Sequence, residues 1–142
     1  MSSQIDSQIQ IECNLGAIRK TSEWLRAVCK DVDPGSLAEL ELGVVEAVTN
    51  IVKHSGIVSE TEKFSLELSR QNNAIKVVIT DTGEPISPAA LDFSETVLDF
   101  DPQDVANLPT SGLGLAIIRE VTDDFEYQTH NGINTMCLIK RI

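Results

Sequence analysis

The stretch Glu41-Leu-Gly-Val-Val-Glu46-Ala-Val-Thr-Asn50-Ile-Val-Lys-His54 contains the pattern that decides the fold. Its apolar residues recur at helical spacing and predict an amphipathic helix over about residues 36–53 that packs against a sheet. The apolar stripe of this helix comprises Leu37, Leu40, Val44, Ala47, Val48 and Ile51. At about 100° per residue, a separate polar stripe carries Glu39, Gly43, Glu46 and Asn50.

Glu46 and Asn50 are the two residues of this polar stripe whose side chains could take part in chemistry. Residues four apart on a helix share one face, so a carboxylate and a carboxamide lie one turn apart. The carboxylate can take up a proton, and the carboxamide oxygen can ligate a hard cation such as Mg²⁺. A lone Glu-x-x-x-Asn pair is more often a solvated helix face, so other segments must support a site.

Segments with strand and helix patterns surround this helix on both sides. In chain order they are a strand at 9–13, a helix from Leu15 to Cys29, the helix at 36–53, strands at 64–68 and 75–79, a helix at 113–121, and strands at 125–130 and 133–139. Gln71-Asn-Asn73 and Asn131-Gly132 predict two antiparallel hairpins, the second through a type I′ turn. We therefore predict an α+β fold, a two-layer sandwich with helices on one face of a mostly antiparallel sheet.

Residues 87–111 form the one long segment without periodicity. They include Pro88, Pro102 and Pro109 together with several acidic residues. Loops of this length in compact domains are usually functional, so the pattern predicts a lid over a site.

Composition limits the kinds of partner and compartment. The 142 residues fit a single domain over 1–142, and the net charge of -11 argues against nucleic acid and anionic membrane surfaces as partners. Three distant cysteines without a CxxC spacing indicate a reducing compartment. The first residues lack a signal-peptide pattern, and no apolar run approaches the roughly 20 residues that span a bilayer. We expect a cytoplasmic protein.

Two further segments are compatible with phosphate and base binding. Asp81-Thr-Gly83 ends a strand, where a carboxylate can accept a hydrogen bond from an exocyclic amine, although Asp and Gly are also ordinary turn residues. Ser111-Gly112-Leu113-Gly114-Leu115 opens a helix whose free N–H groups can bind phosphate, although it can equally be a glycine-rich helix start without a ligand. It is neither a dinucleotide fingerprint, because Ile117 stands at the third glycine position, nor a Walker loop.

Four segments in this order resemble the GHKL superfamily of ATP-binding domains, shared by histidine kinases, gyrase, Hsp90-type chaperones and MutL. More narrowly, the chain resembles the bacterial anti-sigma-factor serine kinases, also called switch-protein kinases. The matching segments are Glu46–His54, Asp81–Pro88, Gly112–Ile118 and Asp123–Tyr127. The resemblance covers essentially the whole chain, and four boxes in register favour a site over the simpler interpretation of each box.

The resemblance implies a role for each matched residue. Asn50 would ligate Mg²⁺, Glu46 would be the catalytic base, and Asp81 would bind the adenine amine with Gly83 beneath the base. The phosphates would lie on the loop that comprises Gly112, Leu113, Gly114 and Leu115. Thr135 matches a C-terminal threonine near the adenine, but Asn134 replaces the usual glycine before it, and Ser55 replaces a small residue after His54.

The resemblance also implies a function with two parts. Such proteins use ATP to phosphorylate a serine or threonine on a small STAS-domain anti-sigma-factor antagonist. The unphosphorylated antagonist competes with a sigma factor, or another target, for the kinase, which is usually a homodimer. Two alternatives are a non-enzymatic ATP-gated protein-binding module and an isolated histidine-kinase catalytic domain. The second is disfavoured because no dimerisation helices with a phospho-accepting histidine are present in the sequence.

Overall fold

The structure confirms the predicted order of strands and helices. The computed structural model describes residues 5–54, 62–87 and 113–142. The elements are β1 (Ser7–Glu12), α1 (Ala17–Val28), α2 (Pro34–His54), β2 (Lys63–Gln71), β3 (Ala74–Asp81), α3 (Leu113–Val121), β4 (Asp124–His130) and β5 (Ile133–Arg141). The predicted lid at about 87–111 lies outside the described residues, except for Ser87.

Two tight turns with left-handed backbone form the predicted hairpins. Asn72 and Asn73, with φ of 44° and 67°, connect β2 to β3, and Asn131 and Gly132, with φ of 52° and 77°, connect β4 to β5. Positive φ at both central residues is the mark of a type I′ turn, whose twist matches that of the paired strands. The Asn-Gly signal in the sequence therefore fixed the register of the C-terminal hairpin.

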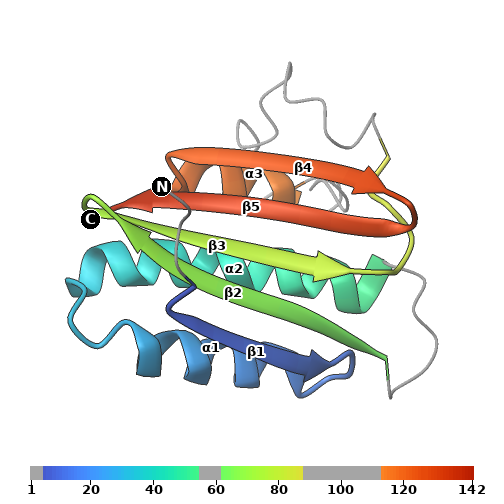
Figure 1. Ribbon diagram of the computed structural model, residues 1–142, viewed down its shortest axis with the longest axis horizontal. Coiled ribbons are helices and arrows are strands. Elements are labelled where there is room, and N and C mark those ends of the chain that lie inside the picture. The colour runs from blue at the N-terminus through green and yellow to red at the C-terminus, as the bar shows by residue number, and fades with distance from the viewer. Residues whose placement is uncertain (1–4, 55–61, 88–112) are drawn as a thin grey trace, which may run out of the picture.

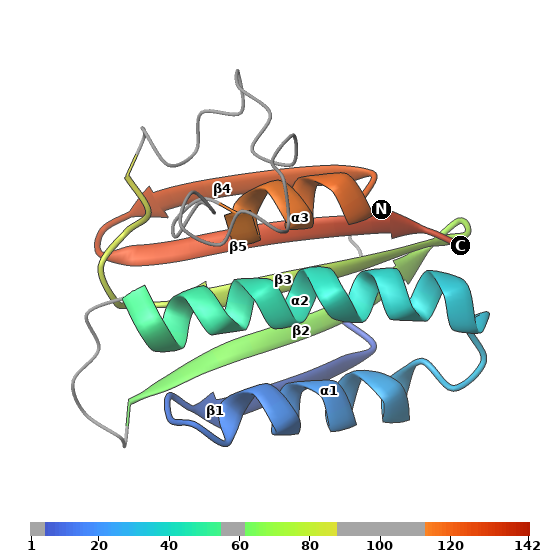
Figure 2. The ribbon, with the colours of Figure 1, turned by 180° about the vertical axis from the view of Figure 1, so that it is seen from behind.

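The five strands form one antiparallel sheet in the order β1-β2-β3-β5-β4. Figure 1 shows the sheet from its uncovered face, and Figure 2 shows α1, α2 and α3 side by side on the opposite face. The pairing of β3 with β5 joins the two hairpins, which are far apart in the sequence. This arrangement is the predicted α+β two-layer sandwich.

The core lies between the helices and the sheet. Side chains alternate across a strand, and the helix-facing set is apolar and buried. It comprises Ile11 from β1, Phe64, Leu66 and Leu68 from β2, Ile75, Val77 and Ile79 from β3, and Met136 and Leu138 from β5. The predicted apolar stripe of α2 packs on this set, with Leu40, Val44, Ala47, Val48 and Ile51 buried. Leu15, predicted to belong to the apolar face of the first helix, precedes α1 and is 93% exposed.

The second stripe of α2 is not simply a solvated face. Glu39 Oε2 forms an ion pair with Lys140 Nζ of β5 at 2.6 Å. Gly43 is buried against α3, since a Cβ built on it would lie 3.2 Å from Val121 Cγ2. The absence of a side chain at this position lets α3 approach α2 closely. Asp33 caps the start of α2 by accepting a hydrogen bond from Ser36 N at 2.9 Å.

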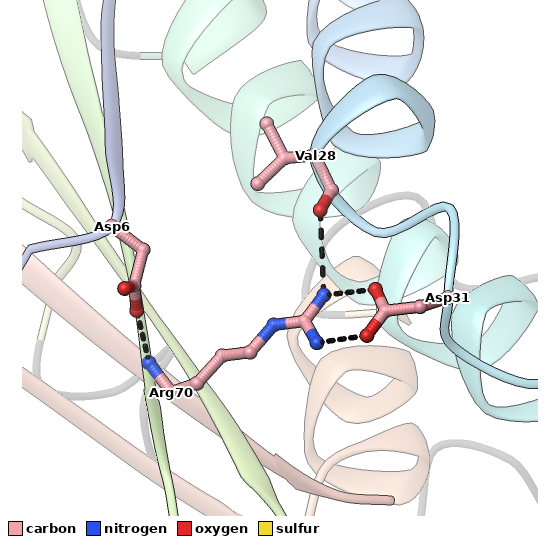
Figure 3. A network of polar contacts seen from close by, with 4 residues as sticks. All are labelled: Asp6, Val28, Asp31 and Arg70. Atoms are coloured by element: carbon pink, nitrogen blue, oxygen red, sulfur yellow. Dashed lines mark hydrogen bonds and ion pairs between the residues drawn. The ribbon is translucent and has the colours of Figure 1, made fainter.

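Arg70 of β2 ties the sheet to the loop between α1 and α2. Its backbone N–H donates to Asp6 Oδ2 at 2.8 Å, and its guanidinium contacts both carboxylate oxygens of Asp31 at 2.6 and 2.7 Å. Nη2 also donates to the carbonyl oxygen of Val28 at 3.3 Å, at the C-terminal end of α1 (Figure 3). One side chain thus fixes the end of α1 and the following loop against the sheet.

We expect Arg70→Leu to lower Tm by about 3 °C at neutral pH, because a partly exposed two-point ion pair is lost. The Arg70 guanidinium holds the pKa of Asp31 below its usual 3.8. A carboxyl with a depressed pKa contributes stability above the unfolded value and loses it as pH falls further. The Tm difference from wild type should therefore shrink when melts at about pH 7 are repeated at about pH 3.

Arg19→Leu is the matched control for this prediction. Arg19 contacts Glu23 at 3.5 Å, and both side chains are largely exposed, so its removal should leave Tm unchanged. An equal Tm difference for Arg70→Leu at both pH values would show that Asp31 is not the source of the stabilisation.

Among the helices of the described residues, none is long and apolar enough to cross a membrane.

Candidate functional site

The predicted site segments lie at one end of the sandwich. Figure 2 shows that α2 ends, α3 begins and β3 ends on the same side of the molecule. The end of β4 and the start of β5 lie there too, because their hairpin pairs His130 with Ile133 and Thr129 with Asn134. Residues separated by more than 80 positions in the sequence are thus brought together by the sheet topology.

The contact between α2 and α3 places the start of α3 beside Asn50. Gly43 faces Val121 and Thr122, at the end of α3, and the two helices run in opposite directions. At 1.5 Å per residue, the eight steps from Val121 back to Leu113 cover about 12 Å. The seven steps forward from Gly43 to Asn50 along α2 cover a similar length, about 10.5 Å. The face of α2 that carries Gly43 also carries Glu46 and Asn50, at spacings of three and seven.

Glu46 and Asn50 are half-buried and available to a ligand. Neither side chain makes a hydrogen bond or ion pair with the rest of the described chain. The adjoining helix N-terminus carries partial positive charge and free N–H groups, which favour an anion. A carboxylate and a carboxamide therefore lie on the α2 face that packs against α3, whose N-terminus has the polarity that attracts an anion.

The segment that the sequence predicts to bind phosphate is described only in part. Gly112 lies outside the described residues, as does Ser111, whereas Leu113 and Gly114 begin α3. Leu115 is buried in the core with 4% of its surface exposed. The side chain of Leu115 therefore anchors the helix in the core, so a role for this residue in phosphate binding would fall to its backbone N–H.

Asp81 ends β3 as a buried carboxylate, 7% exposed. Its Oδ2 accepts two hydrogen bonds, from Gly83 N at 3.0 Å and from Asn134 Nδ2 at 3.2 Å. Oδ1 has no hydrogen-bond partner within the described residues, and it is not among buried atoms that lack one. Within the described residues, Oδ1 is therefore free to accept a further hydrogen bond, such as one from a ligand.

Burial raises the pKa of Asp81 above its ordinary value, and the hydrogen bonds from Asn134 and Gly83 oppose the rise. Keeping a carboxylate in a place that disfavours its charge lowers the stability of the unliganded protein. Such a group is typical of a binding site, where the charge or the acceptor is needed by a ligand.

Asn134 and Thr129 complete the surroundings of Asp81, and the sequence did not assign them to the site. Asn134 is 1% exposed and pairs with Asp81 across β3 and β5. Its Nδ2 also donates to the carbonyl oxygen of Gly83 at 2.9 Å, and its Oδ1 accepts from Thr129 Oγ1 at 2.8 Å. The available signal was the alternation in β5, where Asn134 holds the same helix-facing parity as Met136.

Thr135 lies elsewhere in the structure. It follows Asn134 in β5 and pairs with Thr80, which precedes Asp81 in β3. Because neighbouring side chains in a strand point to opposite faces, Thr135 lies on the helix-free face of the sheet, away from Asp81. The residue that the geometry brings to the carboxylate is Asn134.

The segment after β3 is held against β4. The hydroxyl oxygen of Tyr127 accepts a hydrogen bond from Ile86 N at 2.9 Å. Ile86 and Tyr127 both pack at the edge of the core. Together with the Gly83 contacts, this bond fixes the turn that follows Asp81, so the acceptor at Oδ1 has a defined direction.

These residues fit a magnesium-bound nucleoside triphosphate. Asp81 Oδ1 offers an acceptor for a base amine, and the α3 N-terminus offers donors for phosphate. Asn50 offers an uncharged oxygen ligand, and Mg²⁺ commonly takes one or two protein ligands with the remainder from phosphate and water. The fit rests on Oδ1 of a buried carboxylate and on the side chains of Glu46 and Asn50, none of which has a polar partner among the described residues.

Comparison with known proteins defines the class. Residues 11–140 match the histidine kinase-like ATPase domain family, and the chain belongs to this family. It is 26% identical over 101 residues to the serine-protein kinase RsbW of Bacillus subtilis (strain 168), across 68% of this chain and 60% of the relative. It is 23% identical over 104 residues to RsbW of Bacillus thuringiensis (strain Al Hakam), across 70% and 61%. The chain thus spans about three fifths of the length of these relatives.

Solved structures share the fold. The RsbU and RsbW domains of Rv1364c from Mycobacterium tuberculosis match with a TM-score of 0.67 at 15% identity, over 95% of this chain and 32% of that chain. The catalytic domain of histidine kinase ThkA matches with a TM-score of 0.53 at 12% identity, over 95% of both chains. With the family match and the RsbW relatives, these confirm the resemblance and the fold predicted from the sequence.

Proposed function

We propose that this chain is an ATP-dependent protein serine/threonine kinase that acts in the cytoplasm on a small STAS-domain anti-sigma-factor antagonist. In the proposal, the unphosphorylated antagonist competes with a sigma factor, or another regulatory target, for the kinase, which acts as a homodimer. The similarity to serine-protein kinase RsbW supports the reaction type. The observation that carries the proposal is the position of Glu46 and Asn50 on the α2 face against which α3 begins.

Each site residue then has a defined task. Asp81 would select and orient the base through Oδ1, and Asn50 would hold the Mg²⁺ that accompanies ATP. Gly83 lies beneath the base, and the segment of Gly112 and Gly114 holds phosphate oxygens through backbone N–H groups. When bound, Mg·ATP would supply the phosphoryl group, with ADP as the leaving group, and its Mg²⁺ would offset part of the negative charge of the phosphates. Glu46 accepts the proton of the attacking serine or threonine hydroxyl.

The test is phosphorylation of a partner. The purified chain is incubated with Mg·ATP and, one at a time, with the STAS-domain proteins of the same organism. We expect one of them to gain a single acid-stable phosphoryl group, which tandem mass spectrometry places on a serine or threonine. Light scattering on the same sample is expected to report a dimer.

The possible outcomes separate the proposed kinase from its alternatives. An acid-labile phosphate on a partner histidine would indicate a histidine-kinase catalytic domain and would contradict the proposal. Binding of ATP together with capture of a STAS-domain partner whose mass never changes would indicate an ATP-gated binding module. A substrate phosphorylated on serine or threonine only in the presence of this chain supports the kinase.

A further inference from the structure

We propose that Asn134 is a positioning residue that makes the site select a base with an exocyclic amine. Held by Thr129, it occupies Oδ2 of Asp81 and leaves Oδ1 as the only acceptor that the carboxylate offers to a base. The inference rests on the proposed nucleotide site and adds to it a determinant of base specificity.

The hydrogen bonds of Asn134 fix the orientation of its side chain. Its Oδ1 accepts from Thr129 Oγ1, and its Nδ2 donates to Asp81 Oδ2 and to the Gly83 carbonyl oxygen. A flipped amide would place its oxygen against two acceptors, a carboxylate and a carbonyl. Because Asn134 is 1% exposed, water cannot relieve that repulsion, so the donor side must face Asp81.

The orientation of Asn134 determines what Asp81 can recognise. Oδ2 already accepts from Asn134 and from Gly83 N, so a ligand donor must approach Oδ1. Adenine presents an amine donor at its six position, whereas guanine presents a carbonyl oxygen there. A carbonyl facing a carboxylate brings two acceptors together without a proton, and a site built around such a group rejects the wrong partner strongly.

Asn134 also supports the charge of Asp81. It is an uncharged donor on a carboxylate whose burial disfavours ionisation, and it connects three strands, because Asp81, Asn134 and Thr129 belong to β3, β5 and β4. Without the amide, the carboxylate would lose one of its two fixed donors and would be free to rotate. Either carboxylate oxygen could then turn toward the base, in more than one orientation. The discrimination between bases would weaken as a result.

The test measures what the base amine contributes to binding. Affinities are measured by calorimetry for Mg·ATP, Mg·GTP and magnesium purine riboside triphosphate, which lacks the amine. We expect wild type to bind ATP at least about 10-fold tighter than the amine-free analogue, in keeping with a hydrogen bond to a charged acceptor. In Asn134→Ala this advantage should fall to about 2-fold, and the preference for ATP over GTP should fall with it.

Two further variants make the test independent of folding defects. Thr129→Val removes only the hydroxyl that holds Asn134, at an exposed position, and should reduce the amine advantage by about 3-fold. Thr80→Val is its matched control, because Thr80 adjoins Asp81 in β3 but points to the opposite face of the sheet. It should leave all three affinities unchanged.

The outcomes for this inference and for the proposed function are distinguishable. Suppose that wild type binds ATP and that both Asn134→Ala and Thr129→Val keep the preference for ATP over the amine-free analogue and over GTP. Asn134 then serves the fold alone, and the inference is overturned. If Asn134→Ala does not fold, Thr129→Val decides by the same criterion. If wild type binds none of the three nucleotides, the nucleotide site itself is refuted, and the role of Asn134 with it.

Discussion

Asp81→Asn is expected to weaken ATP binding by about 100-fold while leaving the unliganded fold at least as stable. The oxygen of the new amide can accept the hydrogen bonds from Gly83 and Asn134 that Oδ2 accepts now. Its NH₂ group then takes the place of Oδ1, where a donor would face the donor amine of the base. The substitution keeps the shape of the side chain but replaces the acceptor that the base amine needs with a donor.

The stability of this variant follows from the raised pKa of Asp81, whose burial lifts it above 3.8. When a carboxyl has a higher pKa in the folded than in the unfolded protein, the protein loses stability as the pH rises from the unfolded-state pKa through the folded-state pKa. At neutral pH the ionised Asp81 therefore destabilises the protein, and an amide removes that cost.

Thermal melts with and without Mg·ATP measure the effects of the substitution on stability and on nucleotide binding. Wild type should gain in Tm with nucleotide, since a ligand that binds only the folded state stabilises it, and Asp81→Asn should gain much less at the same nucleotide concentration. Glu84→Gln, a carboxylate-to-amide change at an exposed neighbouring position, should behave as wild type. A nucleotide-induced gain of normal size in Asp81→Asn would refute the assignment of Asp81 to the base.

Glu46→Gln is expected to slow phosphoryl transfer to the partner by about 10² to 10⁴-fold, the range for loss of a general base. Glutamine is similar in size and cannot take the hydroxyl proton. Since Glu46 makes no hydrogen bond or ion pair with the described part of the fold, Tm and the affinity for Mg·ATP should change little. Rates are measured at saturating partner, so that weaker partner binding is not mistaken for slower transfer.

Glu39→Gln is the matched control for Glu46→Gln. Glu39 lies seven residues earlier on the same face of α2, where it pairs with Lys140. Its neutralisation should leave the transfer rate as in wild type. Full activity in Glu46→Gln would remove Glu46 as the base, and loss of activity in both variants would point to a general effect of charge.

Local sequence patterns predicted most of the fold, because the interactions behind them are local. The Asn131-Gly132 turn, the alternation in each strand and the apolar stripe of α2 each depend on neighbours a few residues away. The confirmed expectations are of this kind. Helical spacing likewise placed Glu46 and Asn50 on a face separate from the apolar stripe, and α2 keeps that geometry.

The missed features arise from contacts between distant segments. Asn134 reaches Asp81 across 53 positions, and only the pairing of β3 with β5 brings them together. Gly43 belonged to a polar stripe in the sequence, yet α3 covers it, because the missing side chain permits close helix packing. The same non-local pairing puts Thr135 on the other face of the sheet, which the match to a family motif could not show.

Calorimetric titration of the wild-type chain with ATP, in Mg²⁺ and again in EDTA, tests the nucleotide site most directly. We expect one site per chain with micromolar-range affinity in Mg²⁺ and weaker binding when the metal is removed, because in the proposed site Asn50 would help to hold the cation that accompanies the phosphates. Absence of binding up to millimolar Mg·ATP would contradict the site, and the proposed kinase activity would fall with it.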